Sequence, residues 1–362
     1  MGPHDTKSKG ALQRTDRRDA ITKHSPLGLK KHNPQPLMTM ETPILNEHNK
    51  QEYPPMHKRK QNNELKMRKS KTYRYDDEFK AKARAHQFAF RENVLNDFYD
   101  EKNPQVILTP DAAKKGLIFC DTYRDFIQKK RAFGTSALFS NMLRSEHIPY
   151  NIFTPMEEDL SAATALFNEV IGGGISCINN IHIEFAGQSP DRSEYLNDGT
   201  SFDTFIEYTT TDGDKGGIGI EVKYTENGYR IGEKEKEDIE KPNGTYRQVS
   251  EESNYFISSL DIKSFIKANH LRQIWRNHIL GYSMLKKGEI KRFHYIHLYP
   301  EGNRHFHKYA VPEYIQLLSE DGRKSFIALT YESLFGLIDS HFKQIVQREW
   351  LEYLRKRYIV KI

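Results

Sequence analysis

Residues 217–224, G-I-G-I-E-V-K-Y, alternate apolar side chains with glycine or charge, and this period of two predicts a β-strand. Successive side chains on a strand point to opposite faces, so Glu221 and Lys223 share one face with Gly219. The other face is apolar and suits a protein core. The glycines ahead of the charged pair are expected to leave room for a bulky ligand to approach the strand.

The segment before this strand predicts a partner for it. Residues 200–208, T-S-F-D-T-F-I-E-Y, alternate in the same way and put Asp203 on the face opposite Phe202 and Ile206. The turn that follows, T-T-T-D-G-D-K-G-G, predicts a hairpin. Adjacent strands lie about 4.8 Å apart, so with suitable register Asp203 and Glu221 reach one divalent ion. Oxygen ligands suit Mg²⁺ or Mn²⁺.

These three charged residues predict phosphodiester cleavage. A metal held by Asp203 and Glu221 would polarise the scissile phosphate and lower the pKa of a bound water, while Lys223 would orient that water and stabilise the developing charge. The alternative is an exposed Glu and Lys that form a surface ion pair worth at most about 1 kcal/mol. A bare E-x-K also occurs often by chance.

The order of elements around the hairpin predicts a mixed α/β fold, an αβββαβ core in which helices flank a central mixed sheet. An acidic, polar stretch at 233–244 separates the third strand from the second core helix. In chain order, the predicted core elements are helix 157–171, strands 175–186, 201–209 and 217–225, helix 261–286, strand 291–299, strand 325–330 and helix 331–358.

An α-rich subregion is predicted at 75–154, before a nuclease-like core at 155–362. Within it we expect a helix from about Tyr75 and further helices at 110–115 and 136–146. The residues I-P-Y-N-I-F at 148–153 are expected to be extended, with Pro149 as a breaker.

Residues 1–74 are expected to form a disordered basic tail, because they show no sustained periodicity and are rich in Pro, Asn, Gln and Lys. Residues 1–75 contain 11 Lys and 6 Arg against 3 Asp and 4 Glu, a net charge of +10, which leaves −4 for the rest. The tail is either a basic arm that attracts phosphates or a solvated leader. Met38 and Met40 leave a later natural start open.

The remaining composition excludes several classes of protein. The chain has no apolar run of about 18 residues and no secretory signal, so we expect a cytoplasmic protein without a membrane partner. Cys120 and Cys177 are the only cysteines and lie outside any C-x-x-C spacing, which indicates neither a disulfide framework nor a thiolate zinc site. No phosphate-binding loop, dinucleotide fingerprint, H-E-x-x-H or G-x-S-x-G motif is present.

Asp203 followed by E-V-K on the next strand, within this order of elements, resembles the PD-(D/E)XK nuclease superfamily. The likeness covers roughly 75–362. More narrowly, the chain resembles a bacterial group described as restriction-endonuclease-like. Four segments carry that likeness, namely N-M-L-R-S-E-H-I-P-Y-N-I-F (141–153), D-G-T-S-F-D (198–203), G-I-G-I-E-V-K-Y-T-E (217–226) and L-R-Q-I-W-R-N-H-I-L (271–280).

The resemblance implies a Mg²⁺-dependent nuclease with metal ligands at Asp203 and Glu221 and a catalytic lysine at Lys223. One departure is that Phe202 stands where the superfamily's motif usually has a proline. Many such nucleases also place a glutamate on the first core helix. Glu169 is the favoured residue for that third metal ligand, in competition with Glu158, Glu146 and a plain surface or capping role.

The helix at 261–286 carries a second set of candidates. Gln273, Arg276 and Asn277 are spaced to share a polar helix face that would border the site and contact nucleic acid. The resemblance favours Gln273, because related nucleases often carry a glutamine on this helix, and Arg276 is a candidate phosphate contact. The alternative is a solvated face.

The wider stretch 263–308 also predicts a nucleic-acid-binding surface. It contains ten Lys or Arg, among them Arg272, against Glu289 and Glu301, with aromatic residues interleaved. A merely basic surface is the alternative reading.

The sequence therefore predicts a metal-dependent DNA endonuclease, with restriction or defence against foreign DNA as a role that rests on the resemblance alone. The expected partner is double-stranded DNA, and a homo-oligomer is left open. The alternatives are an inactive nucleic-acid-binding protein that keeps the fold and a nuclease that acts on RNA.

Overall fold

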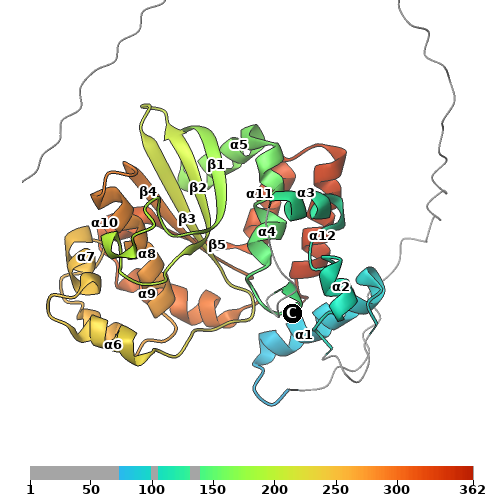
Figure 1. The fold of residues 1–362 in the computed structure, drawn as a ribbon, viewed down its shortest axis with the longest axis horizontal. Helices are drawn as coiled ribbons and strands as arrows, with labels where there is room; N and C mark the ends of the chain where they lie inside the picture. The colour runs from blue at the N-terminus through green and yellow to red at the C-terminus, as the bar shows by residue number, and fades with distance from the viewer. Residues whose placement is uncertain (1–72, 99–104, 131–138, 362) are drawn as a thin grey trace, which may run out of the picture. The chain divides into compact units, whose positions relative to one another are not determined.

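The computed structural model describes residues 73–98, 105–130 and 139–361, and its centre is a five-stranded sheet with the strands in sequence order (Figure 1). Strands β1 to β3 are antiparallel to one another, whereas β4 and β5 run parallel to β3. The sheet is therefore mixed, as predicted. The strands are β1 (Ile175–Phe185), β2 (Phe202–Thr210), β3 (Lys215–Val222), β4 (Arg292–Tyr299) and β5 (Phe326–Thr330).

Strands β2 and β3 form the predicted hairpin. Thr204 lies opposite Ile220, and the pairing continues regularly to Thr209 opposite Lys215. The turn is closed by hydrogen bonds between Thr210 and Asp214, with Gly213 at a positive φ of 85°. Since glycine tolerates this conformation without steric cost, the T-D-G-D sequence explains the tight reversal.

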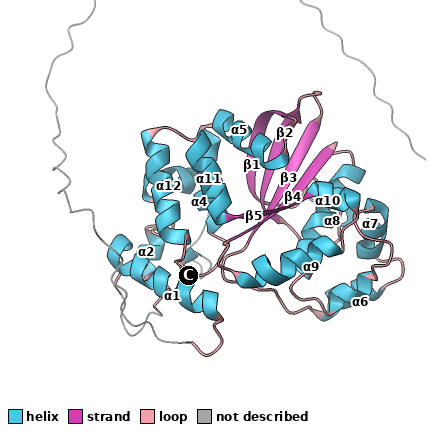
Figure 2. Ribbon diagram, turned by 180° about the vertical axis from the view of Figure 1, so that it is seen from behind, coloured by secondary structure: helices cyan, strands magenta, loops and turns pink. Residues whose placement is uncertain are grey.

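One face of the sheet packs against helices from both ends of the chain, as Figures 1 and 2 show. The apolar face predicted for β3 is confirmed, because Ile218, Ile220 and Val222 are buried in this layer. Helix α5 ends at Gly172, which has a positive φ of 81° and caps the helix as expected. The helices whose residues join this core are α1 (Glu78–Phe90), α2 (Pro110–Lys114), α3 (Arg124–Lys130), α4 (Ile148–Ile152), α5 (Leu160–Ile171), α11 (Tyr331–His341) and α12 (Ile345–Tyr358).

The opposite face is covered by the segments that connect β3 to β4 and β4 to β5 (Figure 2). Parallel neighbours need such crossovers, and here helices supply them. The helices are α6 (Glu233–Glu240), α7 (Thr245–Ser253), α8 (Arg272–Lys286), α9 (Val311–Gln316) and α10 (Glu320–Ser325). The long helix α8 packs directly on β3 and β4, so its residues can reach the charged face of β3.

The α-rich start of the described chain is confirmed in part. Helix α1 and the short α2 form where the sequence predicts them. The described part of 136–146 contains no α-helix, and the residues predicted to be extended form helix α4 instead. Pro149 lies in the first turn of α4, where its missing N–H leaves no helical hydrogen bond unmade.

Two further predictions about helices are wrong in detail, and one stretch for which no element was predicted is helical. The acidic stretch at 233–244 forms α6, and another helix, α7, follows it. The helix expected to begin at residue 261 begins at Arg272, after a 3-10 turn at Ile262–Ile266. The long C-terminal helix is two helices, because Gln344 starts α12 with a reciprocal capping box to Gln347.

The glycines of β3 do not leave room for a ligand. A Cβ atom at Gly217 would lie 2.4 Å from the ring of Phe205, and one at Gly219 would lie 2.3 Å from the ring of Phe202. These contacts are far shorter than carbon atoms tolerate. Aromatic rings from β2 therefore fill the space predicted to admit a ligand. The alternation predicted Phe202 on the face of Ile206, but Phe202 packs with Phe205 on the opposite face, that of Gly219.

No helix in the described ranges combines the length and apolar character that a membrane span requires. The predicted basic tail lies outside the described residues, except for its last two positions. The domain boundaries drawn at residues 74 and 154 stay predictions.

Candidate active site

Asp203 and Glu221 lie opposite each other at the open end of the hairpin. The pairing of Thr204 with Ile220, continued by one residue, makes them direct cross-strand neighbours. The backbone N–H of Val222 donates a hydrogen bond of 2.7 Å to Asp203 Oδ2. The carboxylate of β2 is therefore fixed to the end of β3, and the register that the sequence left open brings the two carboxylates together.

Glu221 is nearly inaccessible, with 1% of its surface exposed, and it lies among three donors. Lys223 Nζ is 2.6 Å from Glu221 Oε1. From helix α8, the side-chain amides of Gln273 and Asn277 donate to the two carboxylate oxygens, one to each. The carboxylate of Glu221 thus connects β3 to α8, and Glu221 and Gln273 are 52 residues apart in sequence.

The cluster contains more carboxylates than cations. Burial raises the pKa of Asp203 well above its usual value, and the neighbouring charge of Glu221 raises it further. Burial also raises the pKa of Glu221, while Lys223 opposes this. Burial by itself would lower the pKa of Lys223, but Glu221 and Asp203 outweigh it and raise the pKa, so Lys223 stays protonated. Two facing carboxylates thus share one ammonium.

The position of α8 explains why its polar residues reach the site. Residues three and four apart lie on one helix face, so Gln273, Arg276 and Asn277 point the same way, as predicted. The other faces of α8 are mostly buried, and Ile274, Trp275 and neighbouring residues pack against the sheet and α7. Packing of these buried faces therefore fixes the polar face against the charged end of β3.

Arg276 forms a second acid and cation cluster beside the first. Its two terminal nitrogens donate to Asp198 and Thr200, at 2.6 Å each, and to Tyr229 at 2.5 Å and Glu235 at 3.1 Å. An open pocket of about 350 Å³ lies between the two clusters, lined by Gly199, Thr200, Ser201, Asp203, Tyr229, Gln273, Arg276 and Asn277. Arg276 therefore borders the pocket, with its terminal donors already engaged by protein groups.

The predicted role of Arg272 in nucleic-acid binding is not supported by its placement. Its side chain is fully buried, and its guanidinium donates to three backbone carbonyls and to Asn269 Oδ1. Every one of these partners belongs to the protein. Arg272 therefore holds the segments at Tyr229 and at 265–269 together and is not available to a phosphate.

Much of the predicted basic surface is neutralised by ion pairs. Besides Arg276, four of its cations pair with carboxylates, namely Lys286 with Glu252, Lys287 with Glu194, Arg292 with Asp212 and Arg304 with Glu78. Exposed pairs of this kind contribute little free energy, so a phosphate can still compete for the cations. The stretch 263–308 is less strongly positive than its composition indicates.

The third acidic ligand is not placed by the structure where the sequence analysis favoured it. Glu169 is exposed and lies 2.9 Å from His341 on α11, away from the groups that face Asp203. Glu184, at the end of β1, was missed. The β1 register continues to place it opposite Asp203, and burial together with the charges of Glu221 and Glu146 raises its pKa. Strand alternation combined with antiparallel pairing would have identified it.

The donor set fits a divalent cation. Within the described ranges no group of three or more His, Cys, Asp or Glu side chains is arranged to hold a metal. Asp203 and Glu221 are nevertheless a buried acidic pair, with the Lys223 ammonium against Glu221, and a cation would relieve their repulsion. Mg²⁺ suits such a pair, because it is commonly held by one or two carboxylates and keeps several waters.

The comparisons with known proteins agree with the motif. A family model described as the PD-(D/E)XK nuclease superfamily matches residues 74–360, most of the chain. No curated protein and no solved structure matches the chain significantly. The matched range contains every residue of the site described above.

Proposed function

The chain belongs to the PD-(D/E)XK nuclease superfamily, and from that premise we propose that it is a metal-dependent endonuclease that hydrolyses phosphodiester bonds in DNA. The observation that carries the proposal is the direct opposition of Asp203 and Glu221, with Lys223 Nζ 2.6 Å from Glu221. Carboxylates and an ammonium in this arrangement supply what phosphoryl transfer to water needs, namely a cation site and a fixed positive charge.

Asp203 and Glu221 would hold the divalent ion, Mg²⁺ or Mn²⁺. When bound, the ion supplies Lewis-acid activation of the phosphate and of the attacking water. The two residues are held by different groups. Asp203 accepts a hydrogen bond from the backbone N–H of Val222, whereas Glu221 accepts from the side-chain amides of Gln273 and Asn277.

Lys223 acts as a cation and not as a base. Its raised pKa keeps the ammonium charged, so it cannot accept the proton of the attacking water. It can donate a hydrogen bond that orients that water, and its charge stabilises the negative charge that develops on the phosphate. Glu221 keeps Lys223 in position through the 2.6 Å contact.

Gln273 and Asn277 position Glu221. Their amides donate to its two oxygens, which limits rotation of the carboxylate. Groups that hold a metal ligand in this way commonly alter metal affinity as strongly as they alter rate. We therefore assign them a supporting role at the metal site in addition to the contact with nucleic acid expected from the sequence.

The choice of DNA, the role in restriction or defence and a cytoplasmic location follow from the resemblance and the sequence. An inactive nucleic-acid-binding protein would lack one of the three charged groups, whereas Asp203, Glu221 and Lys223 are all present.

The test is an incubation of the purified protein with linear, plasmid and single-stranded DNA and with RNA, each with Mg²⁺ or with EDTA. We expect cleavage of DNA with Mg²⁺ and none with EDTA. Linearisation of the closed plasmid would identify an endonuclease. Cleavage confined to RNA would replace the DNA proposal, and metal-independent products or no cleavage of any substrate would overturn the enzymatic one.

A further inference from the structure

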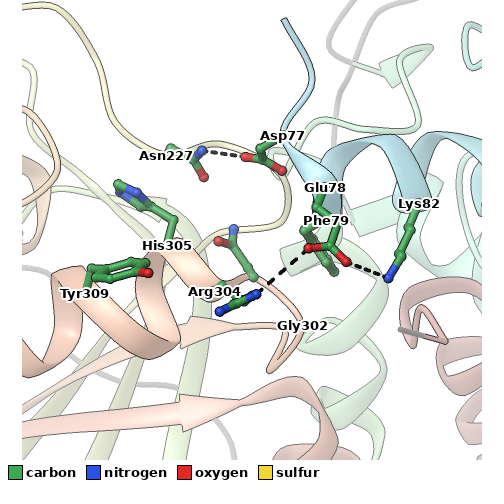
Figure 3. A pocket seen from close by; sticks show the side chains of 10 residues that line it. Asp77, Glu78, Phe79, Lys82, Asn227, Gly302, Arg304, His305 and Tyr309 are labelled. Atoms are coloured by element: carbon green, nitrogen blue, oxygen red, sulfur yellow. Dashed lines mark hydrogen bonds and ion pairs between the residues drawn. The ribbon is translucent and has the colours of Figure 1, made fainter. Parts of the chain in front are cut away.

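A second pocket, of about 240 Å³, lies where the start of α1 meets the loop and π-helical turn after β4. Figure 3 shows its two sides, with His305 and Tyr309 opposite Glu78 and Phe79. Its lining residues are Asp77, Glu78, Phe79, Lys82, Asn227, Gly302, Asn303, Arg304, His305 and Tyr309. None of these belongs to the site around Asp203 and Glu221.

The charged groups that line this pocket cancel one another. The carboxylate of Glu78 lies 2.9 Å from Lys82 and 3.9 Å from Arg304 (Figure 3). Asp77 caps α1 through Lys80 N and accepts a hydrogen bond of 2.7 Å from the Asn227 amide. With two acids and two bases the lining carries no net formal charge, so it favours an uncharged ligand over an isolated phosphate.

Two polar atoms in the pocket lining are buried without a hydrogen-bond partner in the described part of the chain. They are Asn227 Oδ1, an acceptor, and His305 Nε2, which donates or accepts according to the tautomer. Buried polar atoms in native proteins are nearly always hydrogen-bonded, so each unsatisfied one calls for an explanation. Rotation of the two side chains toward the pocket would let a ligand with hydrogen-bonding groups along one edge satisfy both atoms.

The walls favour a flat ligand. Tyr309 exposes 61% of its surface although it is a large aromatic residue, and Phe79 contributes a buried ring to the lining. An exposed tyrosine beside a pocket offers a stacking surface, and stacking on aromatic side chains is the general way in which proteins bind unpaired bases. A planar, uncharged ring with a polar edge is the chemistry of a nucleobase.

The pocket is close to the proposed site of cleavage along the chain. Asn227 lines the second pocket and Tyr229 lines the pocket beside Asp203, so one short segment after β3 separates the two. Asn303, in the lining of the second pocket, donates a hydrogen bond of 3.0 Å to the backbone carbonyl of Tyr224, the residue after Lys223. A strand that crosses the first pocket can therefore continue to the second.

We propose that this pocket binds an unpaired nucleobase of the strand that is cut, stacked on Tyr309 and hydrogen-bonded by Asn227 and His305. The inference rests on the proposed nuclease function. A paired base has its hydrogen-bonding edge occupied, so the pocket selects a strand that is single or locally opened next to the cleavage site.

The experiment measures binding of fluorescein-labelled single-stranded DNA to the full chain by anisotropy in EDTA, which prevents cleavage. The oligonucleotides carry an abasic residue at each position in turn. The variants are Tyr309→Ala, Tyr309→Phe and His305→Ala, with Tyr75→Ala as the control, because Tyr75 is 90% exposed and lies outside the pocket lining. Adenosine and thymidine monophosphate serve as free competitors.

We expect Tyr309→Ala to weaken binding about tenfold, while Tyr309→Phe and Tyr75→Ala bind like the parent. One abasic position should produce a similar loss in the parent and no further loss in Tyr309→Ala. A flat abasic scan, or equal Kd values for Tyr309→Ala and Tyr75→Ala, would overturn the proposal. So would a pocket that binds the free nucleotide but not the strand.

Failure of this inference is separable from failure of the proposed function. If the parent cuts DNA with Mg²⁺ and the abasic scan is flat, only the base pocket is rejected. If the parent neither binds nor cuts nucleic acid, both proposals are rejected.

Discussion

Two clusters of the same composition border the pocket beside α8. One contains Asp203, Glu221 and Lys223, and the other contains Asp198, Glu235 and Arg276. Each combines two carboxylates with one cation.

Their hydrogen bonding differs. The guanidinium of Arg276 engages both of its acids together with Thr200 and Tyr229, so its fork of donors closes the cluster. Lys223 reaches Glu221, while Asp203 and Glu221 face each other directly and the pKa of each is raised.

The difference shows how one set of charges can be structural or chemical. An arginine with planar, directed donors satisfies two carboxylates at once, whereas a lysine between facing carboxylates leaves negative charge for a second cation. We therefore interpret the Arg276 cluster as a wall of the pocket and the Lys223 cluster as its reactive end. Three predictions test that distinction.

The largest expected effect is on cleavage. Replacing Lys223 or Glu221 by Ala should lower the rate of DNA cleavage by at least about a thousandfold, because a charge-stabilising group or a metal ligand is lost. Binding of the same DNA in EDTA should survive, and both variants should still unfold cooperatively on heating, at a temperature lowered by the loss of a buried ion-pair partner. Cleavage at the parental rate by either variant would show that the site is assigned to the wrong residues.

Arg276→Ala should act mainly on stability. It leaves the carboxylates of Asp198 and Glu235, both less than a fifth exposed, without their cation, and the free energy of unfolding should fall by about 3 kcal/mol. Urea denaturation measures this loss in the free energy of unfolding. The matched control is Arg355→Ala, whose exposed pair with Asp339 should contribute no more than about 1 kcal/mol. Equal losses for the two variants would contradict the structural role given to Arg276.

The smallest effect is expected at Asn277, which contacts the reactive cluster without carrying charge. Asn277→Ala removes one of the amides that hold Glu221, so the Mg²⁺ concentration for half-maximal cleavage should rise about 10- to 100-fold. The rate at saturating Mg²⁺ should fall much less. An unchanged Mg²⁺ requirement, with only the maximal rate reduced, would mean that Asn277 acts on the substrate and not on the metal ligand.

The sequence predicted the part of the site that depends on local order. Alternation along 200–208 and 217–224 was enough to find the hairpin and to place Glu221 and Lys223 on one face. A slip of one residue would have sent Asp203 to the opposite face, and only the structure shows the register that pairs it with Glu221.

The side chains of α8 were predicted to share a face, but their tasks could not be predicted. Arg272 and Arg276 are both arginines of helix α8, and both were predicted to contact nucleic acid. One satisfies backbone carbonyls, and the other satisfies acids that come from residues 198 and 235. Which partners a guanidinium meets depends on contacts tens of residues away, and these leave no periodic signal.

The same limit applies to the helices that were misjudged. A proline breaks a helix when it lies in the interior but is tolerated in the first turn. The sequence alone does not say which of these positions Pro149 occupies. The acidic segment at 233–244 has few apolar residues, yet Ile239 is fully buried and ties α6 to the rest of the fold. Helix α6 therefore rests on the burial of a single side chain, which a search for periodic apolar positions does not detect.

The ring of Phe202 over Gly219 gives a different meaning to the one departure from the family motif. Phe202 stands in place of the usual proline, and its ring fills the volume that a side chain at position 219 would need. The aromatic residue before Asp203 and the glycine two residues before Glu221 are thus complementary in volume. A larger residue at position 219 would fit this strand only if the residue at position 202 were smaller than phenylalanine.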